Sequence, residues 1–366
     1  MIPDEIMCSD RVQTHDLTYT ELEVSQMKKK VKFGLAIPTG TEGLMVNLPY
    51  ASARDVIEMS VFAEKLGFDS VWGNDHIHSQ KYVLEEFKQF PRYYSPLLEL
   101  AAIAERTTTL ELCTALFVVP FREPAVAAKE LITLDHISGG RVKIGVGLGA
   151  YREEFEAEFG EKAAHMVRGK MLDESLEIMT RLFKEDYVTY HGQCFDVQEL
   201  QTYPKPIQSP FPFYIGGNSD KSFDRVAKFG TGWLPASLTT DELRHGLAGV
   251  QEACEKVGRS IDEIDVAPQF GISVCRTHEE AEEKFRNCQL YKHAMSLSQS
   301  TMKGRDASNI ADRHLVGSVD EVIERIQQYI DAGVTHFSAM TFVDDDLTQT
   351  KESMQLFAEE VLPAFR

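Results

Sequence analysis

The sequence is poor in cysteine, and its cysteines are not spaced as a metal-binding or redox motif. Six cysteines are scattered over 366 residues, and no two have the spacing of a Cys-x-x-Cys pair. Zinc ribbons and thiol redox sites need such pairs, and small secreted scaffolds need a much higher cysteine density. We therefore expect reduced thiols in a cytoplasmic protein, without a metal site or a disulfide framework.

A long hydrophobic run is also missing. No segment of eighteen or more consecutive apolar residues occurs, which argues against a transmembrane helix. The first thirty residues carry several acidic side chains and no apolar centre, so they do not match a secretory signal peptide. We expect a protein that is neither secreted nor inserted in a membrane.

Positive charge is scarce as well. The chain has 38 Lys and Arg residues against 57 Asp and Glu residues, which gives a formal net charge of -19. Nucleic acids and anionic membrane surfaces are bound by basic faces that release counterions. We therefore expect a small-molecule substrate, and neither a nucleic acid nor a membrane as partner.

The chain contains, instead, an alternation of strand-like and helix-like segments. Ala53 to Leu66, for example, places Val56, Met59 and Ala63 at helical spacing before a stop at Gly67. Eight segments are interpreted as strands: Val31 to Ile37, Ser70 to Trp72, Leu110 to Phe117, Val142 to Val146, Phe213 to Ile215, Gly232 to Leu234, Ile264 to Phe270 and Val334 to Met340. Because helical patterns separate almost all of them, an α/β fold of the (β/α)₈ TIM-barrel type is favoured over an open sheet.

The barrel is expected to occupy residues 31–366 as a single domain, after a polar and flexible N-terminal extension of residues 1–30. Two segments depart from the repeat. Residues 187–197 alternate with period two around a glycine and predict an extra β-hairpin. Residues 284–314 are polar, serine-rich and weakly periodic, and we interpret them as a mobile lid.

Candidate catalytic residues follow the second predicted strand, because barrel enzymes carry their chemistry at the carboxyl ends of the strands. Asp75, His76 and His78 lie there. A single histidine in such a loop is more often structural, but an adjacent aspartate and histidine can present an oriented imidazole to a substrate. After the third strand, Phe117 and Phe121 are either core residues or one wall of a pocket for a flat ring.

Glycines mark two further places. Gly145, Gly147 and Gly149 alternate along the fourth strand, which indicates that a ligand or a neighbouring backbone approaches that face closely. The pattern lacks the turn, helix and spaced acid of a dinucleotide-binding fingerprint. Gly216 and Gly217 begin a second glycine-rich turn.

This second turn, Gly216 to Ser219, leads from the fifth strand into a helix. Backbone amides at a helix N-terminus bind phosphate, and the helix dipole adds to the attraction. The alternative is an ordinary N-cap by Asn218 or Ser219. Arg168 is either a countercharge for the phosphate or a solvated side chain.

Taken together, these motifs resemble the bacterial luciferase-like superfamily. The resemblance rests on five segments: Gly67 to Trp72 with Asp75 and His76, Pro120 to Pro124, Leu134 to Arg141, Gly145 to Gly149, and Lys205-Pro206 leading into Gly216 to Ser219. It covers roughly residues 31 to 366. It implies a TIM barrel that binds FMN or the deazaflavin coenzyme F420 and that forms a homodimer. The DSVWxxDH and TLDHISGGR segments are similar to the deazaflavin branch.

The resemblance also implies roles for individual residues. It places His76 beside the flavin or deazaflavin ring, and a non-proline cis peptide at Ala115-Leu116 behind that ring. With the residues argued from the sequence itself, the predicted cofactor-binding set comprises Ala115, Leu116, Gly147, Gly149, Arg168, Gly216, Gly217, Asn218 and Ser219, and the predicted substrate-pocket set comprises His78, Phe117, Phe121 and Tyr151. Sugar-phosphate dehydrogenases of the deazaflavin branch have a glutamate and a tryptophan where this chain has Ala150 and Gln80, which argues against that activity.

Three functions remain open at this point. The leading expectation is an oxidoreductase of the monooxygenase type, in which reduced FMN from a partner reductase reacts with O₂ and a small, partly hydrophobic substrate. The alternative is an F420-dependent reductase or dehydrogenase that works by direct hydride transfer. The third is a non-catalytic flavin-binding protein.

Overall fold

The computed structural model describes residues 30–299 and 310–366, and residues 31–366 form one compact unit. The predicted extension of residues 1–30 therefore lies, apart from Lys30, outside the described residues. Residues 300–309 of the predicted lid also lie outside the described residues. Within the described part of the chain, no helix has both the length and the apolar character needed to span a membrane.

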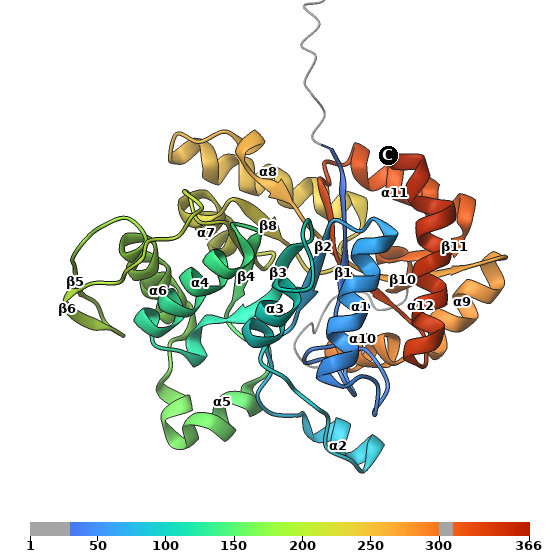
Figure 1. The fold of residues 1–366 in the computed structure, drawn as a ribbon, viewed down its shortest axis with the longest axis horizontal. Helices are drawn as coiled ribbons and strands as arrows, with labels where there is room; N and C mark the ends of the chain where they lie inside the picture. Colours follow the sequence, from blue (N-terminus) through green and yellow to red (C-terminus); the bar gives the residue numbers. More distant parts are fainter. Residues whose placement is uncertain (1–29, 300–309) are drawn as a thin grey trace, which may run out of the picture. The chain divides into compact units, whose positions relative to one another are not determined.

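A curled parallel sheet forms the centre of the molecule and confirms the predicted (β/α)₈ TIM-barrel architecture. Its strand order is β11-β10-β12-β1-β2-β3-β4-β7-β8-β9. The ten strands are β1 (Lys32–Ala36), β2 (Ser70–Gly73), β3 (Glu111–Val118), β4 (Val142–Gly147), β7 (Phe213–Gly216), β8 (Gly232–Leu234), β9 (Asp265–Val266), β10 (Gln269–Cys275), β11 (Leu315–Ser318) and β12 (His336–Phe342). Figure 1 shows the helices surrounding this sheet.

The seventh predicted strand, Ile264 to Phe270, is interrupted in the structure. Pro268 has no N–H to donate, and the chain around it forms β9 and β10 instead of one strand. Hydrogen bonds on either side of this break connect the segment to β12. The backbone N–H of Thr335, just before β12, donates to the Val266 carbonyl at 3.0 Å, and that of Ser338 donates to the Pro268 carbonyl at 3.1 Å. The short edge strand β11 was not predicted.

The described residues form twelve α-helices, most of which cover the outside of the sheet. They are α1 (Ala53–Leu66), α2 (Lys81–Phe87), α3 (Pro96–Ala104), α4 (Pro124–Ser138), α5 (Arg152–Phe159), α6 (Arg168–Leu182), α7 (Asp220–Phe229), α8 (Thr240–Lys256), α9 (His278–Asn287), α10 (Gln289–Gln299), α11 (Val319–Asp331) and α12 (Leu347–Leu356). The first of these matches its prediction in full: Ser52 forms a capping box with Asp55, and Gly67 ends the helix at φ 87°.

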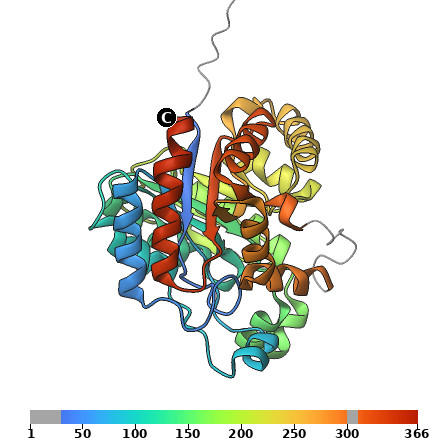
Figure 2. The same cartoon turned by 90° about the vertical axis from the view of Figure 1, so that its right-hand side faces the viewer.

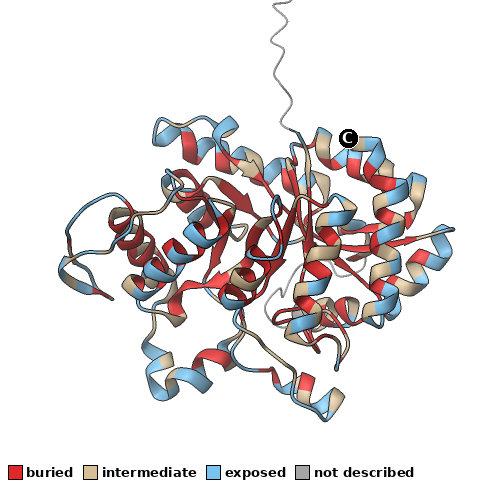
Figure 3. Ribbon diagram, viewed as in Figure 1, coloured by how far each residue is buried: buried red, intermediate tan, exposed pale blue. Residues whose placement is uncertain are grey.

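The core has two parts. The larger one fills the layer between the sheet and the helices, and a smaller cluster inside the barrel includes Trp72 and Tyr214, whose rings meet edge to face at 5.8 Å. Figure 3 shows buried residues along the strands and on the inner helix faces, and exposed residues on the outer helix faces. This is the pattern that the helical periodicity predicted.

Charged side chains close the amino-terminal end of the barrel. Glu111 lies 2.5 Å from the Lys32 amine and 3.1 Å from that of Lys143, and the Tyr214 hydroxyl donates to Asp265 at 2.6 Å. These contacts join the starts of several strands. In Figure 1, α2 and α5 lie at the other end, where β2 and β4 finish. The residues predicted for the site belong to that carboxyl end.

The predicted hairpin is confirmed, as antiparallel strands β5 (Val188–His191) and β6 (Asp196–Leu200). The buried Glu174 of α6 supports its turn, since it accepts bonds from the backbone amides of Gln193, Cys194 and Phe195 at 2.9 to 3.1 Å.

The predicted lid is more regular than its sequence indicated. Its described part contains α10 and the end of α9, followed by β11 after a short 3₁₀ turn. Figure 2, turned by 90°, shows this region on the side of the barrel that faces the viewer. Its mobility stays a prediction.

Candidate functional site

A cis peptide bond joins Ala115 and Leu116 at the carboxyl end of β3, where the resemblance placed it. The pairing of β3 with β4 shifts in register between Thr114 and Phe117, so the chain bulges at this point. Asn74, after β2, donates its side-chain amide to the Ala115 carbonyl at 2.8 Å. The side chain of Leu116 packs against the cluster inside the barrel.

The glycines of β4 and β7 make room for that leucine. A side chain at Gly147 or at Gly216 would begin 2.5 or 2.7 Å from Leu116 Cδ1, which is too close for a real contact. Gly149 has φ 78°, and a side chain there would meet the Phe155 ring at 2.7 Å. Neighbouring protein atoms therefore explain these glycines, and contact of Gly147 or Gly149 with a cofactor stays a prediction.

His76 is held by Glu154, which the sequence did not single out. The His76 Nδ1 lies 3.0 Å from Glu154 Oε1, and the same oxygen accepts the backbone N–H of Ile77 at 3.2 Å. The Glu154 side chain is fully buried, while that of His76 keeps 13% of its exposure. Because the carboxyl occupies Nδ1, the second ring nitrogen, Nε2, is the one left for a ligand.

Asp75 does not face His76, which corrects the expected Asp-His pair. Its carboxyl accepts two bonds from the Arg122 guanidinium, at 2.6 and 3.0 Å, and one from the Val118 amide at 2.9 Å. Adjacent residues in an extended loop point in opposite directions, so Asp75 reaches back into the protein. Its role is to fix the β2 and β3 loops against each other.

Two tyrosines and a histidine form a chain beside His76. His293 of α10 bonds through Nε2 to the Tyr151 hydroxyl at 2.9 Å and through Nδ1 to the Tyr82 hydroxyl at 2.6 Å. The Tyr151 and Tyr93 rings lie 5.6 and 5.8 Å from the His76 ring. The helix α10 is thereby joined to the loops that carry His76 and Glu154.

Burial sets the protonation states of the His293 and Tyr151 side chains. It lowers the pKa of His293 to about 4, and His76 contributes to the same direction. It also raises the pKa of Tyr151 well above its usual range. His293 is therefore neutral near pH 7, so one tyrosine donates to it and the other accepts from it.

The glycine-rich turn before α7 has the features of an anion site. Gly217 has φ 111°, and its carbonyl accepts a bond from Trp233 Nε1 at 2.8 Å. Ser219 is the N-cap residue but its side chain makes no capping bond, and its hydroxyl lies 3.1 Å from that of Ser222. The first amides of α7 therefore lack a side-chain cap, which contradicts the simple capping alternative.

Arg168 makes its contacts with the loop after β4, and its role as a countercharge stays a prediction. At the start of α6, it donates to the Gly149 carbonyl at 2.8 Å and stacks over the Phe155 ring at 4.7 Å. It thus fixes the loop after β4.

The four predicted substrate-pocket residues lie in different parts of the structure and do not form one pocket. Phe117 is fully buried in the layer between sheet and helices, with the Arg122 guanidinium 4.1 Å from its ring centre, so the expectation of a pocket wall is wrong. Consecutive strand side chains face opposite sides, and Phe117 faces the helices. Phe121 packs at 4.7 Å on Phe155, His78 is exposed, and Tyr151 alone contacts His76.

Several buried polar atoms near His76 and α7 lack a partner among the described residues. They are both amide atoms of Gln80, the Tyr93 hydroxyl, Glu154 Oε2 and Asn218 Oδ1. An unpaired buried polar atom costs about 1–3 kcal/mol, so each one needs an explanation, and a bound ligand is one. The residues present therefore fit a cofactor with a polar ring edge and a phosphate.

The residues that sequence reasoning missed are Glu154, Tyr93 and His293. Glu154 is the third residue of a helix that follows the glycine-rich strand, and this position was a usable signal. His293 gave none, because it comes from a serine-rich segment more than two hundred positions from His76 along the chain.

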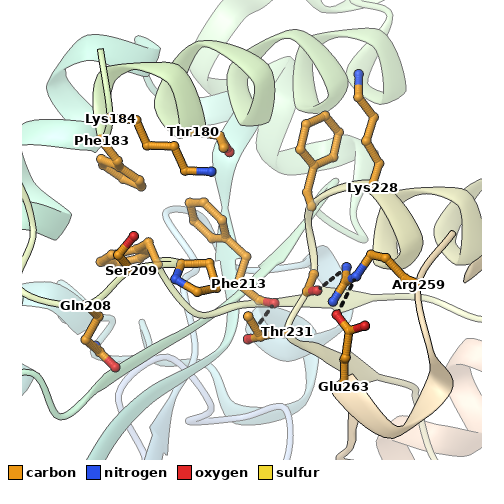
Figure 4. Close-up of a pocket in the computed structure, with 14 residues that line it drawn as sticks. Thr180, Phe183, Lys184, Gln208, Ser209, Phe213, Lys228, Thr231, Arg259 and Glu263 are labelled. Carbon is orange, nitrogen blue, oxygen red and sulfur yellow. Dashed lines mark hydrogen bonds and ion pairs between the residues drawn. The ribbon is translucent and has the colours of Figure 1, made fainter. Parts of the chain in front are cut away.

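A separate cavity lies at the opposite end of the barrel. It has a volume of about 270 Å³ near the starts of β7 and β8, where Figure 4 shows Phe183, Phe213 and Arg259 around it. The Arg259 side chain donates to Glu263 and to the Gly230 carbonyl. Its guanidinium thus binds the carboxyl end of α7 and does not serve as a charge for a ligand in the cavity. Within residues 30–299 and 310–366, no group of three or more His, Cys, Asp or Glu residues is arranged to hold a metal ion.

Comparison with known proteins connects this site to a family. Residues 31–336 match the family model described as luciferase-like monooxygenase. The chain is 30% identical, over 86% of its length and 95% of the relative, to an F420-dependent glucose-6-phosphate dehydrogenase of Amycolatopsis mediterranei (strain U-32).

Solved structures share the fold at lower identity. An F420-dependent secondary alcohol dehydrogenase matches with a TM-score of 0.74 at 22% identity, over 92% of this chain and 99% of the other. A monooxygenase of Streptomyces bottropensis matches with a TM-score of 0.73 at 23% identity, over 92% and 100%. The chain shares the barrel of both.

Proposed function

The chain belongs to the luciferase-like monooxygenase family, and on that premise we propose that it is an F420-dependent oxidoreductase that works by direct hydride transfer. The observation that carries this proposal is the similarity of most of the chain to F420-dependent dehydrogenases. The sequence alone favoured monooxygenation with F420 as the alternative, and the relatives support that alternative more strongly. Both of these activities are those of an oxidoreductase.

The cofactor would lie across the carboxyl ends of the strands. The amides at the start of α7, with Gly217, Asn218 and Ser219, would hold its phosphate. Leu116 and the cis peptide would support the ring from inside the barrel. Bound F420 supplies a carbon that accepts or gives up a hydride.

His76 would move the proton that accompanies the hydride. Oxidation of an alcohol releases a proton from oxygen, and reduction of a carbonyl requires one there. With Nδ1 held by Glu154, His76 presents Nε2 for this transfer. The buried Glu154 carboxyl keeps the ring in one orientation and fixes its tautomer.

The substrate is not proposed to be a sugar phosphate, although relatives carry that name. Gln80 and Ala150 stand where the resemblance to those enzymes requires a tryptophan and a glutamate. Pocket chemistry, rather than fold, sets substrate choice.

A second candidate is monooxygenation with reduced FMN supplied by a partner reductase. The matched family model carries that description. The hydrogen-bonded side chains of Tyr82, His293 and Tyr151 lie beside His76 and would help to keep water from an oxygen-using reaction there.

The deciding experiment is titration of the purified protein with F420 and with anaerobically reduced FMN, followed by fluorescence. Tighter binding of F420, together with substrate-dependent loss of its absorbance, supports hydride transfer. Preference for reduced FMN and O₂ consumption would contradict the proposal and favour the second candidate. Binding of neither would indicate a non-catalytic protein.

We further propose a homodimer that forms through α3 and α4. A groove of about 840 Å³ between these helices and the end of β6 is lined in part by Leu98, Val126 and Ile137. Leu98 is 74% exposed and Val126 53%. Apolar surface of this kind marks contact faces. Light scattering should show a dimer for the wild-type protein and a monomer for Leu98→Lys.

A further inference from the structure

We infer that the cavity at the amino-terminal end of the barrel binds a small aromatic carboxylate, with the ring against phenylalanine side chains and the carboxylate at Lys184. The cavity has a volume of about 270 Å³ and lies between the ends of α6 and α7, next to the starts of β7 and β8. The proposed hydride transfer does not use it, because that reaction belongs to the carboxyl ends of the strands. The inference therefore stands whether or not F420 is the cofactor.

Phenylalanine side chains form the apolar wall of the cavity. Phe183, at the end of α6, lies with its ring centre 4.7 Å from that of Phe211 and 5.9 Å from that of Phe213. Each of these three side chains is at most 7% exposed, and Phe229 of α7 also lines the cavity. Aromatic rings favour offset and edge-to-face contacts with other rings, so this wall suits a flat aromatic ligand.

The volume of the cavity limits the ligand to a single ring. An apolar cavity of about 150 Å³ holds benzene, and pockets for drug-sized molecules begin at about 300 Å³. A benzene ring that carries one small polar group falls between these limits.

The polar wall of the cavity contains three cationic side chains, and two of them are paired. Lys228 lies 2.8 Å from the Glu177 carboxylate, and Arg259 lies 3.1 Å from that of Glu263. The third, Lys184, has no ion-pair partner within residues 30–299 and 310–366. Lys184 therefore offers a positive charge that no side chain of the cavity neutralises.

Lys184 is also directed into the cavity. Figure 4 shows its side chain pointing inward, toward Thr180 and Phe213, while the Lys228 amine points outward. A single unpaired ammonium matches one negative charge, and the Glu263 carboxylate in the same wall disfavours a second. A carboxylate is therefore favoured over a doubly charged phosphate ester.

The ends of the neighbouring helices do not oppose an anion here. Carbonyl groups at a helix C-terminus carry partial negative charge, which repels anions. At the end of α6, the Lys205 amine donates to the Leu182 carbonyl at 2.8 Å. At the end of α7, the Arg259 guanidinium donates to the Ala227 carbonyl at 3.0 Å. Because these cations neutralise both helix ends, the charge of Lys184 remains for a ligand.

The first test uses three ligands that share a ring and differ in charge. The purified protein is titrated with 4-fluorobenzoate, 4-fluorobenzyl alcohol and 4-fluorobenzylamine, and binding is followed by fluorine NMR. The benzoate should bind saturably and at least about fivefold more tightly than the alcohol or the amine, because it alone pairs with Lys184. Equal affinity for the three ligands, or no saturable binding of the benzoate, would overturn the inference.

The second test removes the charge. Lys184→Gln should weaken binding of 4-fluorobenzoate at least about fivefold and leave that of the neutral alcohol nearly unchanged. Lys65→Gln is the matched control, since Lys65 is an exposed lysine in the last turn of α1. Undiminished benzoate affinity in Lys184→Gln would show that the anion binds without this lysine, which contradicts the inference.

The third test locates the ligand. Thr180→Phe places a ring inside the cavity and should abolish binding of 4-fluorobenzoate, whereas His76→Ala, at the opposite end of the barrel, should leave it unchanged. A concentration of about twenty times the Kd should raise the melting temperature of the wild-type protein by about 2–3 °C, and that of Thr180→Phe should not rise. Binding that persists in Thr180→Phe or is lost in His76→Ala would place the ligand elsewhere and overturn the inference.

Discussion

Glu154 and His76 meet at 3.0 Å although 78 positions separate them in the chain. One follows β4 and the other follows β2, and the strand between them brings the two loops together at the same end of the barrel. A carboxyl on Nδ1 selects the tautomer of the imidazole and thereby decides which nitrogen can exchange a proton. The pair is the basis of the first two predictions.

Glu154→Gln should lower kcat by roughly 10- to 100-fold, because an amide no longer fixes the His76 tautomer that leaves Nε2 for the substrate. F420 affinity should stay within about twofold. Steady-state kinetics with Glu156→Gln, an exposed position in the same helix, provides the control. Unchanged kcat in Glu154→Gln would mean that the carboxyl has no part in proton transfer.

His76→Ala should lower turnover by about 10²- to 10⁴-fold, the range expected for loss of a general acid or base. The cofactor should still bind, since the phosphate site that we propose lies at the start of α7 and not at His76. Turnover and F420 binding are measured side by side, with the exposed His245→Ala as the matched variant. Full activity of His76→Ala would remove this residue from the mechanism.

Asn218→Asp should weaken cofactor binding by about tenfold, because it places a negative charge beside the phosphate at the start of α7. The loss should shrink as salt is added, since salt screens partly exposed charges. Asp224→Asn, one turn further along the helix, is the control. Undiminished affinity in Asn218→Asp would place the phosphate elsewhere.

His293 should make the protein less stable in mild acid. Its folded pKa of about 4 is below the ordinary value of 6.5. Between these values the unfolded chain binds a proton that the folded protein does not, so stability falls as pH falls. At pH 5 this effect amounts to about 2 kcal/mol.

Urea unfolding at pH 7 and pH 5 tests this prediction. The loss of stability between the two should be about 2 kcal/mol smaller in His293→Gln than in the wild-type protein. His314, whose pKa burial lowers to about 3, adds the same effect to both proteins and cancels in the comparison. An identical loss in both proteins would contradict the assigned direction.

Asp75→Asn should destabilise the protein by about 3 kcal/mol, because it leaves the Arg122 guanidinium without a counterion in a largely buried setting. The matched variant Asp241→Asn breaks an exposed ion pair with Arg244 and should change the free energy of unfolding by less than about 1 kcal/mol. Equal, small effects would indicate that the Asp75 pair is solvated.

The sequence predicted the barrel well because apolar strands and capped helices are local patterns. The helix from Ala53 to Leu66 shows this, since its apolar residues recur at helical spacing and Gly67 marks its end in the sequence. The break at Pro268 was misread because a run of apolar residues does not reveal where one strand passes from one neighbour to the next. The edge strand β11 is too short to give a pattern.

The site was harder to predict because its contacts join distant segments. His76 was found from its place after a strand, but the direction of Asp75 depends on Arg122, which lies 47 positions away. Phe117 was assigned to the pocket although its side of β3 faces the helices. No local signal connects His293 to Tyr82 or Tyr151, since three separate loops must meet before the bonds form.

The His293 bonds also bear on the order in which the site is built during synthesis. Tyr82 and Tyr151 leave the ribosome long before their common partner, so the loops around His76 lack one wall until α10 has been made. Early barrel units can fold on the nascent chain, but a complete substrate pocket arises only as a late step of translation. A chain stalled ahead of residue 293 would carry His76 and Glu154 without the bonds that tie Tyr82 and Tyr151 to α10.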